Sequence, residues 1–141
     1  MSYSLDNGDT WLTYTLNSVI SLQKDQTVKF RGTNDYLGDY YNGTPRSHTF
    51  YMTGQFEASG DVTSLLNNKG GDHALIYERS FANLFLGGTS LITAPNLPST
   101  TLSDSCYVGM FKGCSSLTKA PILPAKTLAN LCYYNMFYNC T

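Results

Sequence analysis

The chain has 141 residues, of which 42% are hydrophobic and only 13% are charged, and its formal net charge at pH 7 is -1. This composition excludes a disordered chain, which combines high net charge with little apolar content, and it provides no field that would attract nucleic acid or an anionic membrane. No apolar run approaches the roughly 20 residues that span a bilayer, and the first residues show no signal peptide.

Residues 1–60 are predicted to be β-rich. Residues 3–5 and 11–14 flank Asp6-Asn-Gly-Asp, which is typical of a hairpin turn. Further strand candidates lie at 19–22, 27–31, 48–52 and 55–59. Short strands with turn signals at such spacing favour a small sandwich or sheet, which we expect to cap the units that follow. Residues 61–79 form a connecting segment, with a loop composition at 67–72.

The strongest signal is a repeat over residues 80–141, where the sequence matches itself after a shift of 26 residues. In each copy a segment such as 117–124 alternates between apolar and polar residues and contains proline, which predicts a short strand. Leu128, Cys132 and Met136 are spaced like one face of a short helix, with Gly113 and Asn139 as C-caps. One strand and one short helix per unit predict a solenoid. The last unit is incomplete, so we expect a truncated array or an interface for another chain.

The four cysteines occupy two repeat positions, Cys106 with Cys132 and Cys114 with Cys140. Equivalent residues of adjacent units stack at about 4.8 Å, near the short limit for a disulfide. A ladder of buried thiols is favoured, and disulfides remain an alternative. Metal binding is disfavoured because His48 and His73 lie outside the repeat.

The runs at 136–141, 114–128 and 3–11 resemble the BspA-like leucine-rich repeat surface proteins of gut and oral bacteria, and similar repeats occur in mycoplasma surface proteins. The resemblance implies an α+β fold. A small β-rich N-terminal capping domain (1–60) and the connecting segment (61–79) precede a leucine-rich-repeat-type solenoid with a 26-residue period (80–141, about two and a half repeats), truncated at the C-terminus. The resemblance also implies that the protein acts in adhesion or recognition and not in catalysis.

Catalytic and metal-binding motifs are not found in the sequence. The Asp6, Asn7 and Asp9 cluster lacks the calcium-loop pattern and is explained by the hairpin turn. His48 and His73 have no nucleophile motif nearby, and the acidic residues form no evident pair. We therefore expect no enzymatic activity and no cofactor.

Two groups of residues are candidates for ligand binding. The tyrosine-rich loop containing Tyr36, Tyr40 and Tyr41 resembles paratope loops, although its rings could instead fold over the sheet as core. In the repeat, positions that differ between copies would line one exposed face, and they include Lys112, Lys119, Lys126 and Tyr138. Tyr107 and Tyr133 are the same in both copies, so core stacking is favoured for them.

These observations predict a non-catalytic recognition or adhesion module that binds host protein or glycan. The parent protein would be extracellular or at the cell surface. The alternative is a structural or receptor-binding component of a gut bacteriophage virion. We expect no nucleic-acid partner, no membrane insertion, and self-association through the exposed last repeat.

Overall fold

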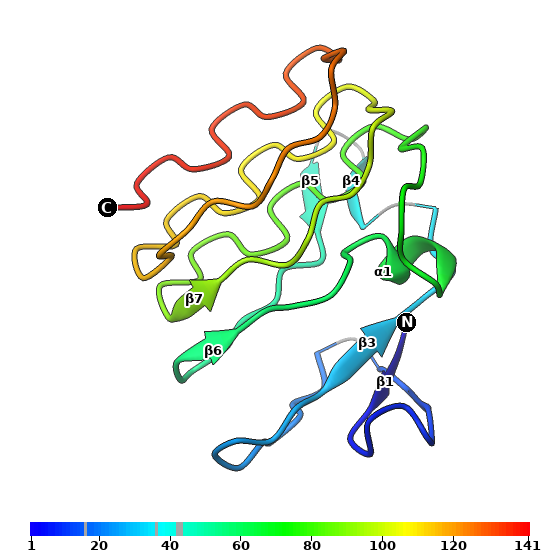
Figure 1. Ribbon diagram of the computed structural model, residues 1–141, viewed down its shortest axis with the longest axis vertical. Helices are drawn as coiled ribbons and strands as arrows, with labels where there is room; N and C mark the ends of the chain where they lie inside the picture. The colour runs from blue at the N-terminus through cyan, green and yellow to red at the C-terminus, as the bar shows by residue number, and fades with distance from the viewer. Residues whose placement is uncertain (16, 36, 42–43) are drawn as a thin grey trace.

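The computed structural model describes residues 1–15, 17–35, 37–41 and 44–141 (Figure 1). Its regular elements are short and are separated by long irregular segments. They are β1 (Ser2–Ser4), β2 (Leu12–Thr13), β3 (Lys29–Arg31), β4 (Gly38–Tyr41), β5 (Thr44–Ser47), β6 (Phe56–Glu57), α1 (Ser64–Asn67) and β7 (Leu91–Thr93).

The predicted α+β fold, with one strand and one helix in each unit of a leucine-rich solenoid, is wrong. Most of the described chain is irregular, and its strands have only two to four residues. The single α-helix among the described residues, α1, has four residues and precedes the repeat. Neither the strand predicted at 117–124 nor the helix predicted around Leu128, Cys132 and Met136 is present.

The helix prediction failed because every fourth residue of this region has a positive φ, whereas an α-helix needs a negative φ throughout. The positions concerned are Arg79, Asn83, Gly87, Ser105, Gly109, Gly113, Leu131, Asn135 and Asn139. Between them the backbone forms successive turns in which an N–H group donates to the carbonyl three residues earlier, as Met110 does to Tyr107. Gly113 and Asn139, predicted as helix C-caps, are such turn residues, with φ of 77° and 59°.

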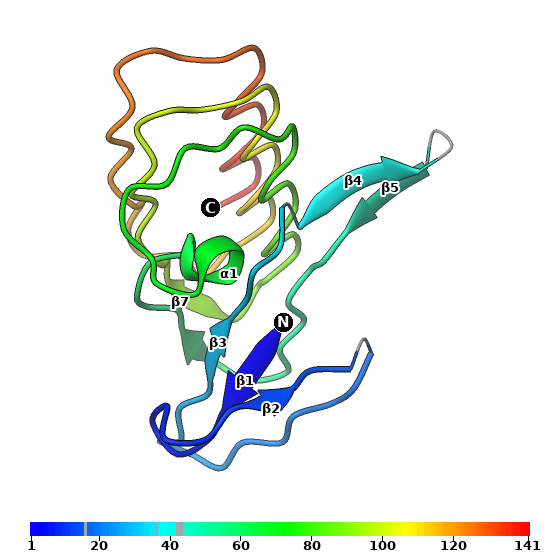
Figure 2. The same cartoon turned by 90° about the vertical axis from the view of Figure 1, so that its right-hand side faces the viewer.

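The copies of the repeat nevertheless lie against one another, as the nested turns in Figure 2 show. Backbone N–H groups of one copy donate to carbonyls of the next, for example Phe81 to Cys106 at 2.8 Å and Tyr107 to Cys132 at 2.9 Å. Equivalent rings stack with centroids 5.6–5.7 Å apart, in the pairs Phe81–Tyr107, Tyr107–Tyr133, Phe85–Phe111 and Phe111–Phe137. The repeat seen in the sequence therefore corresponds to contacts between equivalent residues.

The hairpin predicted at the N-terminus is confirmed. β1 pairs antiparallel with β2 across the turn at residues 6–9, with Tyr3 opposite Leu12. The strand predicted at 19–22 is not formed, and β3, which lies in the candidate at 27–31, pairs antiparallel with β1. Val19 is 89% exposed, so its side chain is not buried against a sheet. The strand predicted at 48–52 is irregular, whereas β6 in the 55–59 segment pairs parallel with β7.

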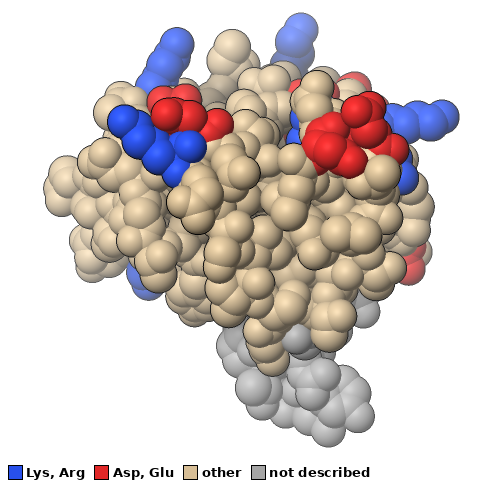
Figure 3. Space-filling model, turned by 90° about the horizontal axis from the view of Figure 1, so that it is seen from below, with Lys and Arg blue, Asp and Glu red and all other residues tan. Residues whose placement is uncertain are grey.

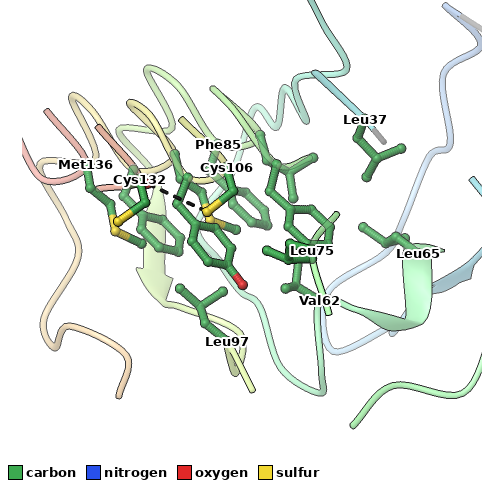
Figure 4. Packing of buried hydrophobic residues seen from close by; sticks show 14 of the residues in the cluster. Leu37, Val62, Leu65, Leu75, Phe85, Leu97, Cys106, Cys132 and Met136 are labelled. Atoms are coloured by element: carbon green, nitrogen blue, oxygen red, sulfur yellow. Dashed lines mark hydrogen bonds between the residues drawn. The ribbon is translucent and has the colours of Figure 1, made fainter. Parts of the chain in front are cut away.

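Residues before the repeat cover its first copy. The backbone N–H of Leu37 donates to the carbonyl of Ser80 at 2.7 Å, and that of Phe50 donates to Leu84 at 2.8 Å. The ring of Phe50 lies on that of Phe85, with centroids 5.8 Å apart. The core then continues from Leu37, Val62, Leu65 and Leu75 through Phe85 and Leu97 to Cys132 and Met136 (Figure 4).

Candidate functional site

Residues 115–141, which we call the last copy of the repeat, carry several exposed apolar side chains. We define the C-terminal apolar surface as Ile122, Leu123, Leu128, Leu131, Tyr134 and Tyr138, which are 38–83% exposed. In the preceding copy the residue equivalent to Leu123 is Leu97, which is 3% exposed. Single exposed apolar residues are ordinary, whereas large contiguous apolar areas are uncommon on soluble proteins and are typical of binding surfaces. We therefore take these residues as the candidate site.

The same copy has a row of backbone donors, which we define as the donor edge: the N–H groups of Leu131, Tyr133, Asn135, Phe137 and Asn139. No acceptor for these groups is found among the described residues. The equivalent groups one copy earlier all donate to the last copy, from Ser105, Tyr107, Gly109, Phe111 and Gly113. The rings of Tyr133 and Phe137 each stack on a preceding ring, and no second ring among the described residues stacks on either of them.

Two of the predicted site residues, Lys112 and Tyr138, are brought together, and Tyr138 is part of the C-terminal apolar surface. The Nζ atom of Lys112 lies 5.2 Å from the ring centroid of Tyr138, which is a cation–π contact. Lys119 and Lys126 are exposed on the same copy. Tyr40 and Tyr41 lie in β4, opposite Pro45 and Thr44 of β5, and this hairpin projects from the rest of the chain (Figure 2). The prediction for Tyr36 lies outside the described residues.

The residues considered as a calcium loop form a closed turn. The Asp6 carboxylate accepts hydrogen bonds from both the backbone N–H and the hydroxyl of Thr10, and from the Ser4 hydroxyl. These bonds, those from Thr10 above all, hold the pKa of Asp6 well below its usual range. The Trp11 indole N–H donates to the Gly8 carbonyl at 2.9 Å. Within the described ranges no three His, Cys, Asp or Glu side chains are grouped so that they could hold a metal ion.

All four cysteines are free thiols, as the favoured prediction had it, and Cys106, Cys114 and Cys132 are buried whereas Cys140 is half-buried. The thiol of Cys114 donates to the Phe85 carbonyl at 3.1 Å, and that of Cys140 donates to the Phe111 carbonyl at 2.9 Å. Burial raises the pKa of Cys106 to about 12 and that of Cys114 to about 11. Because the thiolate is the reactive form, these two groups are poor nucleophiles at neutral pH.

The two tyrosines that are the same in both copies have the predicted role in the core. Tyr107 is 1% exposed and stacks between Phe81 and Tyr133. Burial raises its pKa above the ordinary value for a tyrosine, and burial raises the pKa of Tyr133 to about 12. Neither hydroxyl is therefore suited to proton transfer near neutral pH.

A hollow that the sequence did not indicate lies between the 73–77 segment and α1. It has a volume of about 350 Å³. Its polar lining residues are Asp35, His73, Tyr77 and Ser80, and its apolar ones are Leu66, Ala74, Leu75 and Ile76. Ile76 is 72% exposed, but a single apolar residue in a loop is no signal of a site by itself. The other histidine, His48, places its Nδ1 atom 2.8 Å from the Leu37 carbonyl, which is a structural contact.

Among the described residues on the face shown in Figure 3, positive charge forms no continuous area of the kind that binds nucleic acid. On the face shown in Figure 3, positive and negative side chains lie next to one another along one side, and a wide area carries neither. No helix in the described part of the chain has the length and apolar character needed to cross a membrane. No protein-family model, curated protein or solved structure matches the chain.

Proposed function

We propose that the protein is a non-catalytic recognition module that binds a protein or glycan ligand, as the BspA-like surface proteins that its sequence resembles would do. The observation that carries this proposal is the C-terminal apolar surface. Leaving such side chains in water is unfavourable by roughly 25 cal/mol per Å² of apolar area, so a ligand that covers them gains this free energy. The natural setting of such a module is the cell surface.

The side chains of this surface suit recognition rather than chemistry. Tyr134 and Tyr138 are 56% and 54% exposed, and each offers a large rigid area together with one hydroxyl group. Tyrosine side chains lose little conformational entropy when they are immobilised by a ligand, which is why they are frequent in binding surfaces. Lys112, whose Nζ atom lies 5.2 Å from the ring centroid of Tyr138, adds a charged donor beside this ring, as in the polar rim of an interface.

The test is a binding screen of the purified chain against extracellular-matrix proteins, mucins and glycans. We expect a saturable interaction that is lost in the double variant Tyr134→Ala/Tyr138→Ala. Tyr51→Ala is the matched control, because Tyr51 is 84% exposed and lies outside the C-terminal apolar surface. Loss of binding in Tyr40→Ala/Tyr41→Ala alone would contradict this placement of the site and move it to β4. A screen without any interaction would contradict the proposal and favour the virion-component alternative.

A further inference from the structure

The hollow beside α1 has walls that are held in place by hydrogen bonds within the protein. On one side, the N–H of Gly32 donates to the Ser64 carbonyl of α1 at 3.0 Å. The side-chain amide of Asn34 donates to the Leu65 carbonyl at 2.7 Å. These two bonds fix the stretch that leads to Asp35, so this carboxylate lines a hollow whose wall is already formed.

The opposite wall, the 73–77 segment, presents a backbone acceptor to the hollow. The N–H of Leu75 donates to the Thr101 carbonyl of the next copy at 3.0 Å. The carbonyl of the same peptide group belongs to Ala74, and the C=O and N–H of a trans peptide point in opposite directions. The Ala74 carbonyl therefore points away from the next copy, on the side of the hollow. No group in the described part of the chain donates a hydrogen bond to it.

The charge around the hollow is negative. Asp35 is exposed, and the described residues that line the hollow include no lysine or arginine. Asp72, which precedes the lining residue His73, accepts from the N–H and the hydroxyl of Thr100 at 2.9 and 2.7 Å. These bonds, the one from the backbone above all, lower the pKa of Asp72, so it is ionised at neutral pH. A positively charged ligand is therefore favoured here.

The remaining lining of the hollow is apolar. Leu66, Leu75 and Ile76 contribute to it, and Ile76 is 72% exposed. A ligand that covers Ile76 removes apolar surface from water, which is favourable. The volume of about 350 Å³ lies at the small end of the range for ligand sites, which is roughly 300–1,000 Å³. The hollow therefore suits a small ligand with an apolar body and a cationic, hydrogen-donating end.

We propose that this hollow binds an alkylammonium group, which is the chemistry shared by a lysine side chain of another protein and by a free small amine. An ammonium group has three donors and no acceptor, so it matches the Asp35 carboxylate and the Ala74 carbonyl. Its alkyl chain lies along Leu66 and Ile76, as lysine stems lie along apolar surface elsewhere. This site is separate from the C-terminal apolar surface and goes beyond the proposed function.

The test is a titration of the isotopically labelled full chain with n-butylamine at neutral pH, followed by nuclear magnetic resonance. We expect saturable shifts of the N–H signals of residues 73–77. Asp35→Asn should weaken binding about tenfold, because hydrogen bonds to a charged acceptor are stronger than those to a neutral one. Asp25→Asn is the matched control, since it removes the same charge from an exposed turn outside the hollow. Equal weakening by both variants would overturn the role of Asp35.

Two comparisons of ligands test the same site without any substitution. Butylamine should bind more tightly than methylamine, by up to about fourfold for each methylene group that becomes buried. Equal affinities would overturn the apolar wall. 1-Butanol has the same chain without the charge and should bind far more weakly, so equal binding of butanol would overturn the choice of ammonium. Saturable shifts of the same signals by a methyl glycoside, with none from the amine, would replace the amine by a sugar and overturn the proposal.

A further arm distinguishes the two sources of the ammonium group. Binding of Nα-acetyl-lysine-N-methylamide at least as tight as that of butylamine supports a lysine side chain, whereas binding of butylamine alone supports a free amine. The double variant Tyr134→Ala/Tyr138→Ala should leave the affinity for the amine unchanged. A ligand found in the binding screen, without any effect of amines at high millimolar concentration, would overturn this inference and leave the proposed function intact. Amine binding together with an empty screen would support this inference and contradict the proposed function.

Discussion

At the scale of single residues, the backbone of the repeat is governed by the positions with positive φ. Most of these positions hold glycine or asparagine, which adopt this conformation readily. Arg79, Ser105 and Leu131 are exceptions, with φ of 57°, 57° and 53°, and they occupy the same place in three successive copies. A side chain with a Cβ atom is strained there, so the first turn of each copy stores unfavourable backbone energy.

The strain at Leu131 predicts that a substitution can stabilise the protein. Leu131 is 52% exposed, so Leu131→Asn removes little packing while it relieves the backbone strain. We expect the free energy of unfolding to rise by about 1 kcal/mol, measured by chemical denaturation. Leu128→Asn is the matched control, because Leu128 is 64% exposed and its φ is not positive. An equal change in both variants would show that loss of exposed apolar surface, and not backbone strain, is responsible.

Gly109 predicts the opposite effect. Its φ is 58°, and a Cβ atom added to it would lie 2.5 Å from the Oδ1 atom of Asn83. We expect Gly109→Ala to lower the free energy of unfolding by about 2 kcal/mol, from backbone strain and from displacement of the asparagine. Gly54→Ala is the control, because a Cβ atom at Gly54 meets nothing within 4 Å. Similar midpoints of denaturation for the two variants would contradict the close approach of the copies at Gly109.

Asp6 predicts a dependence of stability on pH. Its hydrogen bonds with Thr10 and Ser4 lower its pKa in the folded protein, so its stabilising contribution is present above the unfolded value of about 4. That contribution is lost as the pH falls through the lower, folded pKa. We expect Asp6→Asn to flatten the dependence of unfolding free energy on pH below about 4, and Thr10→Val to weaken it. An unchanged profile in both variants would contradict this role of the turn.

At the scale of elements, the two columns of stacked rings take the place of regular secondary structure in holding the copies together. Phe111 is 0% exposed and stacks on both faces, between Phe85 and Phe137. We expect Phe111→Leu to cost about 2 kcal/mol of stability. Phe137→Leu should cost about half as much, because Phe137 stacks on one face only. Equal thermal or chemical stability of the two variants would contradict a column that is open at Phe137.

The elements could be predicted from the sequence only where one local signal decides the conformation. The turn at residues 6–9 fixes the β1–β2 hairpin through its own hydrogen bonds. The Ser4 hydroxyl donates to the Asp6 carboxylate and accepts from the backbone N–H of Gly8. Cys132 and Met136 are four residues apart, which suited one face of a helix. Asn135 and Asn139 are also four residues apart, and both have a positive φ. That second pattern is the signal that would have distinguished successive turns from a helix, because helices do not place asparagine or glycine at every fourth residue.

At the scale of the whole molecule, contacts between copies were predictable, whereas the surfaces were not. The 26-residue shift indicated which residues are equivalent, and Tyr107 with Tyr133 stack as expected. The donor edge could not be predicted, because which N–H groups point towards the next copy depends on the turns. The hollow next to Asp35 and His73 brings together residues far apart in the sequence, and no local pattern links them.

The direction of the backbone hydrogen bonds has an electrostatic consequence for the molecule. The peptide groups that connect Leu37 to Ser80, Phe81 to Cys106 and Tyr107 to Cys132 are joined head to tail, so their dipoles add. An α-helix generates its macrodipole in the same way, and here it arises almost without helix. The donor edge is the positive pole of this macrodipole. The potential at this end therefore favours negatively charged groups, although the net charge of the protein is close to zero.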